Sequence, residues 1–478
     1  MAIIIAGERS GVGKTTVTLA LLAAMKARSP VHKSLVQSFK VGPDYIDPMF
    51  HSYITGLPSR NLDPVLTSED YVRSCFARHS QNAEYALIEG VMGLFDGATG
   101  HNDTASTAHV ARLLNAPVVL ILNCASTSRS IAAIAHGYRT FDPRIQIAGV
   151  VLNRVGSDRH LELLTQALAP LELPILGVLR RQDNISIPDR HLGLIPTAEM
   201  SDLDGIIERL AHLGETCFDW GKLLPLMKSL HPPAPSPLVE GEQVLHPSPL
   251  GRGAGGEGKI RIAIAQDRAF SFYYADNLDL FRELGAELIP WSPISDRKLP
   301  ENVQGLYFGG GFPEVFASEL AENKTARESV QTAIKSGIPT YAECGGLMYL
   351  CDRIVDFQEQ SFPMVNIFPT AAKMGKRLTL GYRQAIALQD SPLVKKGDRL
   401  WGHEFHRSSL TEISDRPLYS LKGYDSHLQY PSEGWQEYQV HASYTHLHFG
   451  AQNYLLERFL AKCRSYSNFL SNSPQLTI

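Results

Sequence analysis

The sequence is short of cysteine and of long hydrophobic runs. Six cysteines in 478 residues are too few for a disulfide-stabilised scaffold, and none shows the paired Cys-x-x-Cys spacing of a structural metal site. We therefore expect reduced thiols and a cytoplasmic protein. Apolar runs such as 118–122 fall far below the roughly 20 residues that a membrane helix needs, so no membrane span or membrane partner is expected.

An excess of charge of one sign is also missing. The chain has 45 Lys and Arg against 49 Asp and Glu, a formal net charge of -4. No global basic field therefore favours a nucleic-acid partner, and small-molecule substrates fit better. A length of 478 residues is enough for two sizeable hydrophobic cores.

Periodic hydrophobicity is absent from 232–258, where Pro, Gly and Ser replace it. Such a segment buries too little apolar surface to offset its ordering entropy. We expect a flexible linker at 231–258 between a synthetase domain at 1–230 and a second domain at 259–465, with a C-terminal tail at 466–478. An inserted low-complexity tract is the alternative interpretation of 232–258.

Short β-rich runs alternate with helical stretches on both sides of this segment. They lie at 3–6, 85–88, 118–122, 147–152 and 175–179, and again at 260–265, 305–308 and 338–342. This alternation predicts two α/β domains, each a doubly wound, mostly parallel sheet with helices on both faces. In such sheets ligands bind at the carboxyl ends of the strands.

A glycine-rich loop at 7–16 follows the first of these strands and leads into a helical pattern. Backbone N–H groups of such a loop surround phosphate oxygens, Lys14 reaches the terminal phosphates and Thr15 can ligate Mg²⁺. The loop departs from the strict motif, because five residues separate Gly7 from Gly13 and Glu8 holds the first-glycine place. We expect ATP to bind at Gly11, Gly13, Lys14, Thr15 and Thr16.

Two acidic segments accompany the loop. Lys40, Asp44 and Asp47 surround a Gly-Pro turn, where the carboxylates suit Mg²⁺ or substrate and Lys40 suits a phosphate or a substrate carboxylate. A solvated turn is the plainer interpretation. Glu89 ends an apolar strand, a place where a carboxylate commonly meets the Mg²⁺ of a nucleotide.

In the second half, Cys344 lies between a predicted strand and a predicted helix. A sharp turn there would expose its sulfur at a helix N-terminus, as in a nucleophile elbow. A lone Cys is more often a small buried residue, but Gly345 and Gly346 favour the nucleophile here.

A Cys nucleophile that attacks an amide also needs a base that accepts its proton and an oxyanion site that stabilises the charge developing on the amide oxygen. His446 and His448 end a late strand-like run and are both candidates for the base, with His446 favoured. Gly310 and Gly311 follow the run 305–308, and their N–H groups are candidates for the oxyanion site.

Together these segments resemble the cobyrinate a,c-diamide synthase family, in which a P-loop domain related to dethiobiotin synthetase is fused to a class I glutamine amidotransferase domain. The segments 39–48, 89–97, 402–408 and the Tyr-x-His at His446 carry the resemblance. It implies amidation of the a and c carboxylates of cobyrinic acid through acyl phosphates, with ATP, Mg²⁺ and glutamine, in cobalamin biosynthesis. A homodimer is left open.

The resemblance also implies roles for individual residues. Thr15, Asp44 and Glu89 would hold Mg²⁺, and Asp47 would lie near the carboxylate that is activated. Asn153 would contact adenine, and His403 and His406 would line the glutamine or corrinoid site. Ordinary relatives carry a Glu two residues after the catalytic His, where this chain has His448, so the resemblance implies a Cys–His dyad.

Two kinds of alternative stay open at this point. A hydrogenobyrinate or nickel-sirohydrochlorin diamide synthase would use the same chemistry on another macrocycle. A partitioning or switch ATPase would use the same P-loop, but members of that class commonly carry a Lys where Arg9 stands, and they have no need of a glutaminase.

Overall fold

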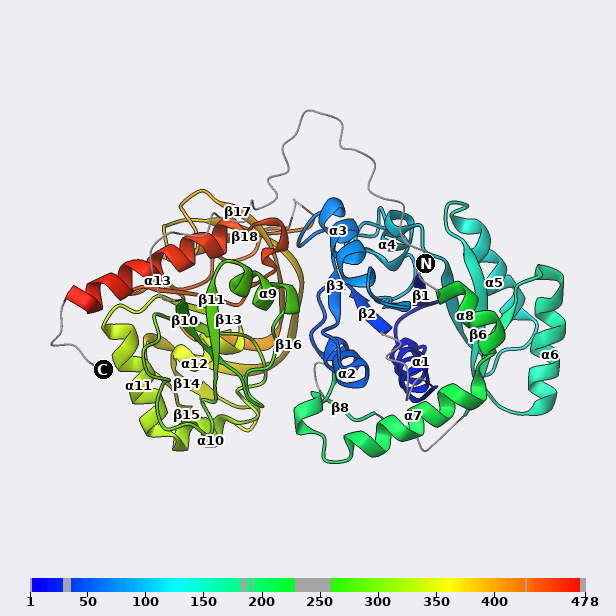
Figure 1. Cartoon of the computed structure of the whole chain (residues 1–478), viewed down its shortest axis with the longest axis horizontal. Coiled ribbons are helices and arrows are strands. Elements are labelled where there is room, and N and C mark those ends of the chain that lie inside the picture. Colours follow the sequence, from blue (N-terminus) through cyan, green and yellow to red (C-terminus); the bar gives the residue numbers. More distant parts are fainter. Residues whose placement is uncertain are drawn as a thin grey trace.

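A computed structural model describes residues 2–28, 36–181, 187–190, 193–227, 259–425 and 428–472. These residues form two α/β domains that lie side by side (Figure 1). The linker expected at 231–258 lies outside the described residues. All six cysteines are free, and none of the described helices has the length and hydrophobicity of a membrane span.

The N-terminal domain is built on a seven-stranded, all-parallel sheet in the order β3-β2-β4-β1-β5-β6-β7. Its strands are β1 (Ala2–Gly7), β2 (Val36–Val41), β3 (Arg60–Leu62), β4 (Tyr85–Glu89), β5 (Val118–Asn123), β6 (Ile147–Val155) and β7 (Ile175–Arg180). Because β1 is central and parallel to its neighbours, the loop after it opens at the same edge as the ends of β2 and β4.

Helices cover both faces of this sheet (Figure 1). They are α1 (Lys14–Arg28), α2 (Ile46–Thr55), α3 (Glu69–Ser80), α4 (Thr107–Leu114), α5 (Ser130–Phe141), α6 (Asp158–Leu168), α7 (Leu203–Cys217) and α8 (Trp220–Met227). Side chains alternate between the faces of a strand. Ile3 and Ile5 therefore pack with α1, α7 and α8, whereas Ile4 packs with residues of α3 to α6.

The C-terminal domain contains a five-stranded parallel sheet in the order β11-β10-β12-β13-β19. Its strands are β10 (Ile260–Ala265), β11 (Ala286–Trp291), β12 (Gly305–Phe308), β13 (Thr340–Glu343) and β19 (Val440–Ser443). Its helices are α9 (Ala275–Glu283), α10 (Ala317–Glu322), α11 (Lys324–Lys335), α12 (Gly345–Leu350) and α13 (Tyr454–Asn472). Helix α13 continues into the segment expected as a tail.

A second sheet of this domain was not predicted. It joins β14 (Cys351–Val355), β15 (Ser361–Pro363), β16 (Phe368–Ala387), β17 (Arg399–Leu410), β18 (Tyr419–Gly423) and β20 (His446–Leu447), mostly in antiparallel pairs. Its β17–β20 pair sets His403 opposite His446. The fold class, α/β with mostly parallel sheets, is confirmed.

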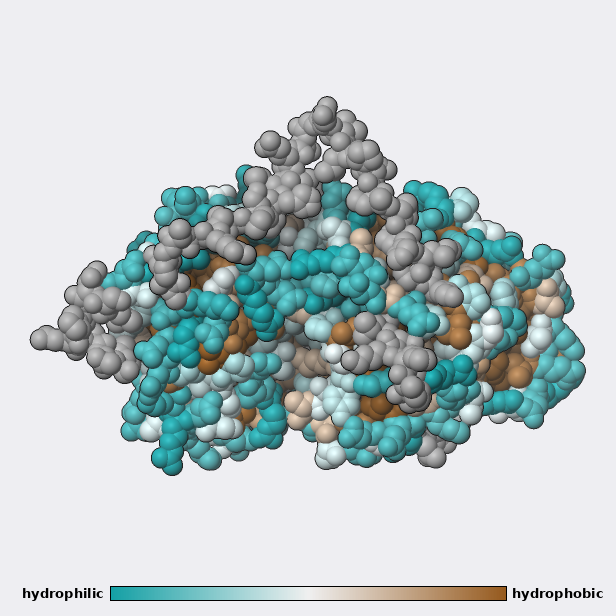
Figure 2. All heavy atoms as spheres, viewed as in Figure 1, coloured by the Kyte–Doolittle hydropathy of each residue, from teal (hydrophilic) through white to brown (hydrophobic). Residues whose placement is uncertain are grey.

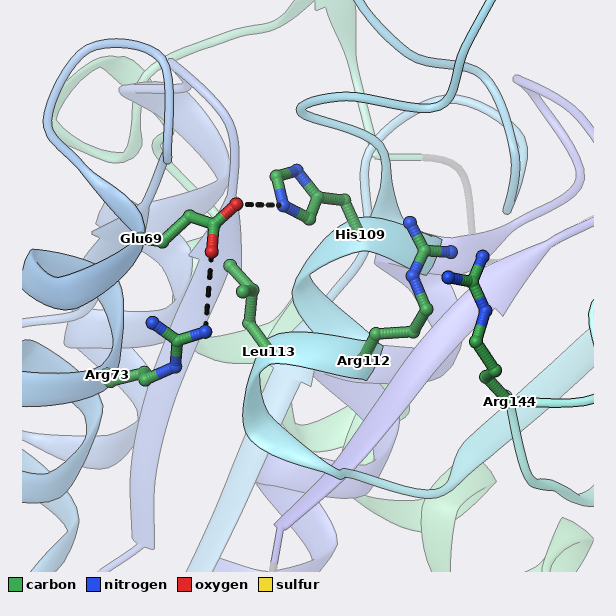
Figure 3. A pocket seen from close by; sticks show the side chains of 6 residues that line it. All are labelled: Glu69, Arg73, His109, Arg112, Leu113 and Arg144. Atoms are coloured by element: carbon green, nitrogen blue, oxygen red, sulfur yellow. Dashed lines mark hydrogen bonds and ion pairs between the residues drawn. The ribbon is translucent and has the colours of Figure 1, made fainter. Parts of the chain in front are cut away.

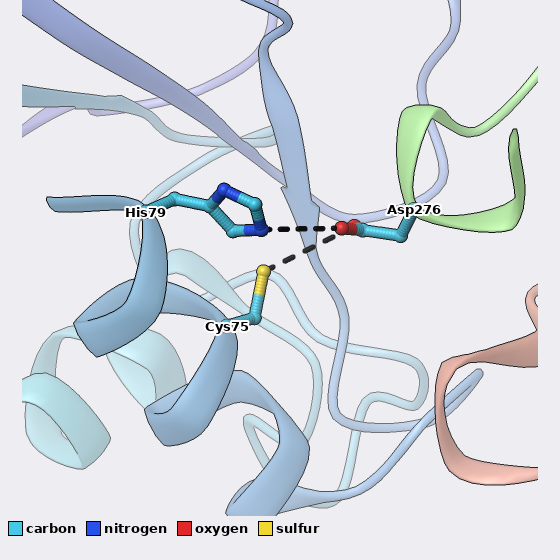
Figure 4. A group of neighbouring side chains, drawn as sticks. All are labelled: Cys75, His79 and Asp276. Carbon is cyan, nitrogen blue, oxygen red and sulfur yellow. Dashed lines mark hydrogen bonds and ion pairs between the residues drawn. The ribbon is translucent and has the colours of Figure 1, made fainter. Parts of the chain in front are cut away.

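Ionic and aromatic contacts join the two domains. Arg60 of β3 lies 3.0 Å from Asp276 and 2.7 Å from Asp279, both on α9. Figure 4 shows Cys75 and His79, one turn apart on α3, directed at the same Asp276 carboxylate. Outside such contacts, the face seen in Figure 2 is mainly hydrophilic, with hydrophobic residues in recesses.

Candidate active site

The phosphate loop joins β1 to α1 in a conformation that depends on glycine. Gly11 and Gly13 have positive φ angles of 75° and 98°, and a Cβ on Gly13 would lie 2.4 Å from Asn153 Nδ2. Lys14 folds over the loop, with its Nζ 3.4 Å from the Arg9 carbonyl oxygen. Burial, with Lys40 nearby, lowers the pKa of Lys14 to about 8.

The predicted acidic residues meet at the edge of the sheet beside this loop. Lys40 and Glu89 are opposite each other in the β2–β4 pair, and Lys40 Nζ lies 3.1 Å from Glu89 Oε1. The same ammonium contacts Asp47 and lies 3.6 Å from Asp44 Oδ2. Thr15 Oγ1, from the start of α1, donates to Glu89 Oε1 at 2.7 Å.

Charges within this cluster shift the pKa values of their neighbours. Burial would lower the pKa of Lys40, but Asp47 and Glu89 outweigh it, and the pKa is raised. Burial would raise the pKa of Glu89, but Lys40 outweighs it, and the pKa is lowered. Burial and the neighbouring Asp44 and Glu89 raise the pKa of Asp47. The cluster therefore contains a firmly charged Lys40–Glu89 pair beside a readily protonated Asp47.

The donor chemistry of this cluster fits Mg²⁺. Carboxylates converge there on one ammonium, and the Thr15 hydroxyl bonds to one of them. Oxygen donors of this type are the ligands that Mg²⁺ prefers. Even with Asp47 protonated, Asp44 and Glu89 face the single ammonium of Lys40 and leave a negative charge that a divalent cation would neutralise. That Thr15, Asp44 and Glu89 would hold it stays a prediction.

His51 belongs to this cluster and was missed by the sequence analysis. Its buried Nε2 lies 2.7 Å from Glu89 Oε2, and its Nδ1 lies 3.3 Å from Ser59 Oγ. The available signal was its position on α2, four residues after Asp47, which sets both side chains on one face of the helix.

Asn153 lies at the phosphate loop, but its side chain is engaged with protein. Its Nδ2 donates to the Val12 carbonyl at 2.8 Å, and its Oδ1 accepts from the Arg154 N–H at 2.8 Å. The amide thus holds the loop from β6, while its contact with adenine stays a prediction.

Cys344 occupies the turn between β13 and α12, as predicted. Its φ is +47°, and neighbouring backbone is so close that a Cβ on Gly346 would lie 2.5 Å from the Phe308 carbonyl oxygen. The thiol is buried, so the expectation of an exposed sulfur was wrong. Burial, with Glu314 and Glu343 nearby, raises the pKa of Cys344. A protonated thiol of this kind needs a base before it can act as a nucleophile.

The two candidate histidines face different neighbours. His446 Nδ1 lies 3.6 Å from Glu343 Oε2, on the residue directly before Cys344. His448 Nε2 lies 3.6 Å from Asp276 Oδ2, and its ring is 5.5 Å from that of Tyr71 on α3. His448 therefore faces the domain interface.

Gly310 and Gly311 lie beside His446 and the nucleophile turn. A Cβ on Gly310 would lie 2.5 Å from His446 Cε1, and one on Gly311 would lie 2.0 Å from the Ala269 carbonyl oxygen. The N–H of Gly309 donates to Tyr273 Oη at 2.9 Å, so that group is already engaged. Both predicted oxyanion positions thus require glycine for lack of space.

The two remaining predicted histidines, His403 and His406, lie in different surroundings. His403 lines the cavity described next, and burial, with His446 nearby, lowers the pKa of His403 to about 3. His406 instead stacks on Tyr444 at 4.0 Å and directs Nδ1 at the Ser408 carbonyl oxygen, 2.8 Å away. It is not part of the cavity wall.

A cavity of about 1110 Å³ connects the two domains. Its N-terminal wall contains the phosphate loop and the Lys40 cluster. Its C-terminal wall is largely aromatic and includes Phe272, Tyr382, Phe405, Tyr424 and Tyr430. Tyr45 crosses this boundary: its ring stacks on Phe272 at 5.2 Å and lies 5.2 Å from the ring of His446.

A second cavity, of about 450 Å³, lies on the N-terminal domain between α3 and α4 (Figure 3). Its arginines are already paired: Arg73 with Glu69, Arg112 with Asp103 and Arg144 with Asp142. The Glu69 carboxylate also accepts from His109. These pairings leave little unmatched positive charge for an anion.

Both halves of the chain match known families. Residues 3–195 match the CobQ/CobB/MinD/ParA nucleotide binding domain, and residues 261–454 match the CobB/CobQ-like glutamine amidotransferase domain. These two matches fall on the two domains described above.

Full-length relatives agree with the domain matches. A cobyrinate a,c-diamide synthase of Synechococcus sp. is 61% identical over 97% of this chain and 98% of that protein, and one of Synechocystis sp. is 51% identical over 98% and 95%. A hydrogenobyrinate a,c-diamide synthase of Streptomyces coelicolor is 41% identical over 97% of each chain. The chain therefore belongs to the cobyrinate a,c-diamide synthase family, as its motifs predicted, and is a glutamine-hydrolysing carbon–nitrogen ligase.

Proposed function

We propose that this protein amidates the a and c carboxylates of cobyrinic acid in two ATP- and glutamine-dependent steps. The observation that carries the proposal is the single cavity of about 1110 Å³ shared by the phosphate loop, the Lys40 cluster and the C-terminal domain. Activation and amidation need a common space, because an activated carboxylate is lost to water unless ammonia reaches it promptly.

In the first half-reaction, the phosphates of ATP lie in the loop at Gly11 and Gly13, against Lys14 and Thr16. Mg²⁺ held by Thr15, Asp44 and Glu89 would neutralise phosphate charge. A substrate carboxylate near Lys40 and Asp47 attacks the γ-phosphorus, the bond to the β-phosphate breaks and ADP leaves. The product is an acyl phosphate, which is a far better electrophile. Ammonia then displaces the phosphate and leaves an amide.

In the second half-reaction, Cys344 attacks the side-chain amide of glutamine. The raised pKa of Cys344 supports a resting thiol whose proton passes to His446. N–H groups of Gly310 and Gly311 are the donors proposed for the developing oxyanion. His448 is the weaker candidate for the base, because it faces Asp276 at the domain interface.

The aromatic wall supports a macrocyclic substrate. Tyr382, Tyr424 and Tyr430 offer flat apolar surface opposite a charged cluster, which suits a large ring with carboxylates on its rim. His403, buried and neutral, lines the same wall.

Hydrogenobyrinate is the second candidate substrate, because the Streptomyces coelicolor relative carries that name. The two substrates differ by the cobalt in the ring, which the protein need not ligate.

A partitioning ATPase is disfavoured by the glutamine amidotransferase domain. Six free cysteines support a reducing compartment such as the cytoplasm.

The direct test is turnover of each macrocycle with ATP, Mg²⁺ and glutamine labelled with heavy nitrogen in its amide. We expect cobyrinic acid to gain two labelled nitrogens and to react with the higher kcat/KM. Preferential turnover of hydrogenobyrinate would favour the second candidate, and label in neither product would overturn the proposal.

A further inference from the structure

His446 is held by contacts on several sides. The Tyr45 ring lies 5.2 Å from its imidazole ring, and Gly310 is so close to Cε1 that it has no room for a Cβ. The buried carboxylate of Glu343 lies 3.6 Å from Nδ1. These contacts fix the ring plane and set an acid at the nitrogen that faces away from Gly310.

The Glu343 carboxylate is itself fixed by three donors. The Tyr341 hydroxyl and the Leu447 N–H, at 3.1 Å, donate to Oε1. The Tyr307 hydroxyl donates to Oε2 at 3.4 Å. An isolated buried carboxylate would be strongly disfavoured, and these donors stabilise its charged form. Oε2 keeps acceptor capacity on the side of His446.

We propose that Glu343 is the acidic positioning residue of the glutaminase, supplied from β13 rather than from the position of His448. The inference rests on the function proposed above for Cys344 and His446. Contact with Glu343 keeps the proton on Nδ1, so that Nε2 is free to accept the proton of the Cys344 thiol. A separation of 3.6 Å is longer than a hydrogen bond, and such contacts commonly tighten when substrate binds.

The chemical step balances with these groups. The thiol proton moves to His446 Nε2 while sulfur bonds to the amide carbon of glutamine, and the C–N bond then breaks as Nε2 returns the proton to the departing ammonia. Water hydrolyses the thioester and releases glutamate. Glu343 forms no covalent bond; its negative charge stabilises the transient imidazolium, as an Asp does in a serine protease.

The test variant is Glu343→Gln, which keeps the shape and one acceptor but removes the charge. We expect kcat for glutamine hydrolysis to fall about 10²- to 10⁴-fold, with KM for glutamine near the parental value. The pH at which activity rises should move lower, because an imidazolium without an adjacent carboxylate loses its proton more readily. Glu343→Asp, which keeps the charge, should recover part of kcat.

Glu322→Gln, at an exposed position of α10, is the matched control for the substitution, and thermal unfolding checks that each variant folds. A parental kcat and pH profile in Glu343→Gln would overturn the proposal. So would a uniform loss with no pH shift and no recovery in Glu343→Asp, since that pattern indicates a packing role. Cys344→Ala is measured in parallel: glutamine hydrolysis that survives it refutes the proposed nucleophile itself.

Discussion

At the scale of single residues, Glu89 shows how position gives a side chain its chemistry. Its two oxygens contact Lys40, Thr15 and His51, which come from a neighbouring strand and from two helices. Together these partners keep a fully buried carboxylate charged, because the opposite charge and the hydrogen bonds outweigh desolvation.

The nitrogen source separates the two proposed half-reactions. Cys344→Ala should abolish glutamine-driven amidation and leave ammonia-driven amidation, because only ammonia release needs the thiol. Lys14→Ala should remove both, since the terminal phosphate of ATP loses its cation. Product formation with glutamine or with ammonium salt checks this. Equal loss of both activities in Cys344→Ala, or ammonia-driven turnover in Lys14→Ala, would contradict the assignment.

Glu433 makes stability depend on pH near the glutaminase turn. Burial, with Glu404 nearby, raises the pKa of Glu433 from 4.5 to about 7. The folded state therefore binds this proton more tightly than the unfolded state. The stabilisation, about 3 kcal/mol, is complete below pH 4.5 and is lost as the pH rises through about 7.

Glu433→Gln is neutral at every pH, and the hydroxyls of Ser443 and Thr445 can rotate to accept from its amide. We therefore expect its Tm to fall less than that of the parent between pH 5 and pH 8. Thermal unfolding at several pH values measures this difference. Parallel pH profiles for the two proteins would show that Glu433 does not titrate in this range.

At the scale of elements, α1 carries Lys14 and Thr15 and is held in place by α7. The two helices cross closely at Gly214, where a Cβ would lie 2.2 Å from the Ala20 carbonyl oxygen and 2.6 Å from Ala24 Cβ. Close approach at this crossing is possible because Gly214 has no side chain.

Gly214→Ala should force α7 away from α1 and destabilise the domain by about 1–3 kcal/mol, seen as a lower Tm. Gly137→Ala on α5 is the matched control, because nothing lies within 4 Å of its Cβ position. That variant should keep or raise Tm, since Ala favours helix over Gly. A Tm for Gly214→Ala equal to that of the control would refute the packing argument.

At the scale of the whole molecule, the contacts that couple the domains include the Tyr45 ring and a buried ionic cluster. Tyr45 lies between Asp44 and Asp47 in sequence and touches the ring of His446, so it adjoins both proposed reaction sites. Nearby, Arg60, His79 and His448 surround the Asp276 carboxylate. Substrate binding at one site can therefore change the geometry of the other site.

Asp276→Asn should weaken this junction, because loss of one partner from a buried ion cluster typically costs about 3–5 kcal/mol. We expect more glutamine hydrolysed per amide formed, as ammonia escapes from a loosened cavity. The ratio of glutamate to amidated product measures this. Glu283→Gln is the control. Its pair with Arg78 also joins α3 to α9, but the Arg78 and Glu283 side chains are 61% and 41% exposed. Exposed ion pairs contribute little to stability. An unchanged ratio in Asp276→Asn would contradict the coupling.

The sequence by itself determined the parallel sheets, the phosphate loop, Lys40, Glu89 and the turn at Cys344. These features are local: hydrophobic runs, glycines and turn residues specify them within a few positions. The strands expected at 85–88 and 147–152 correspond to β4 and β6 with small differences at their ends.

Only the tertiary structure decided which distant groups meet. His51 joins Glu89 across 38 residues, Glu343 of β13 meets His446 of β20, and the antiparallel β17–β20 pair sets His403 opposite His446. No local pattern encodes these contacts, because they depend on strand order and on the docking of two separate domains. The same geometry turned His448 toward Asp276 and set His446 beside the nucleophile turn. In the sequence the two histidines are only neighbours on one strand-like run, so their different positions cannot be predicted from it.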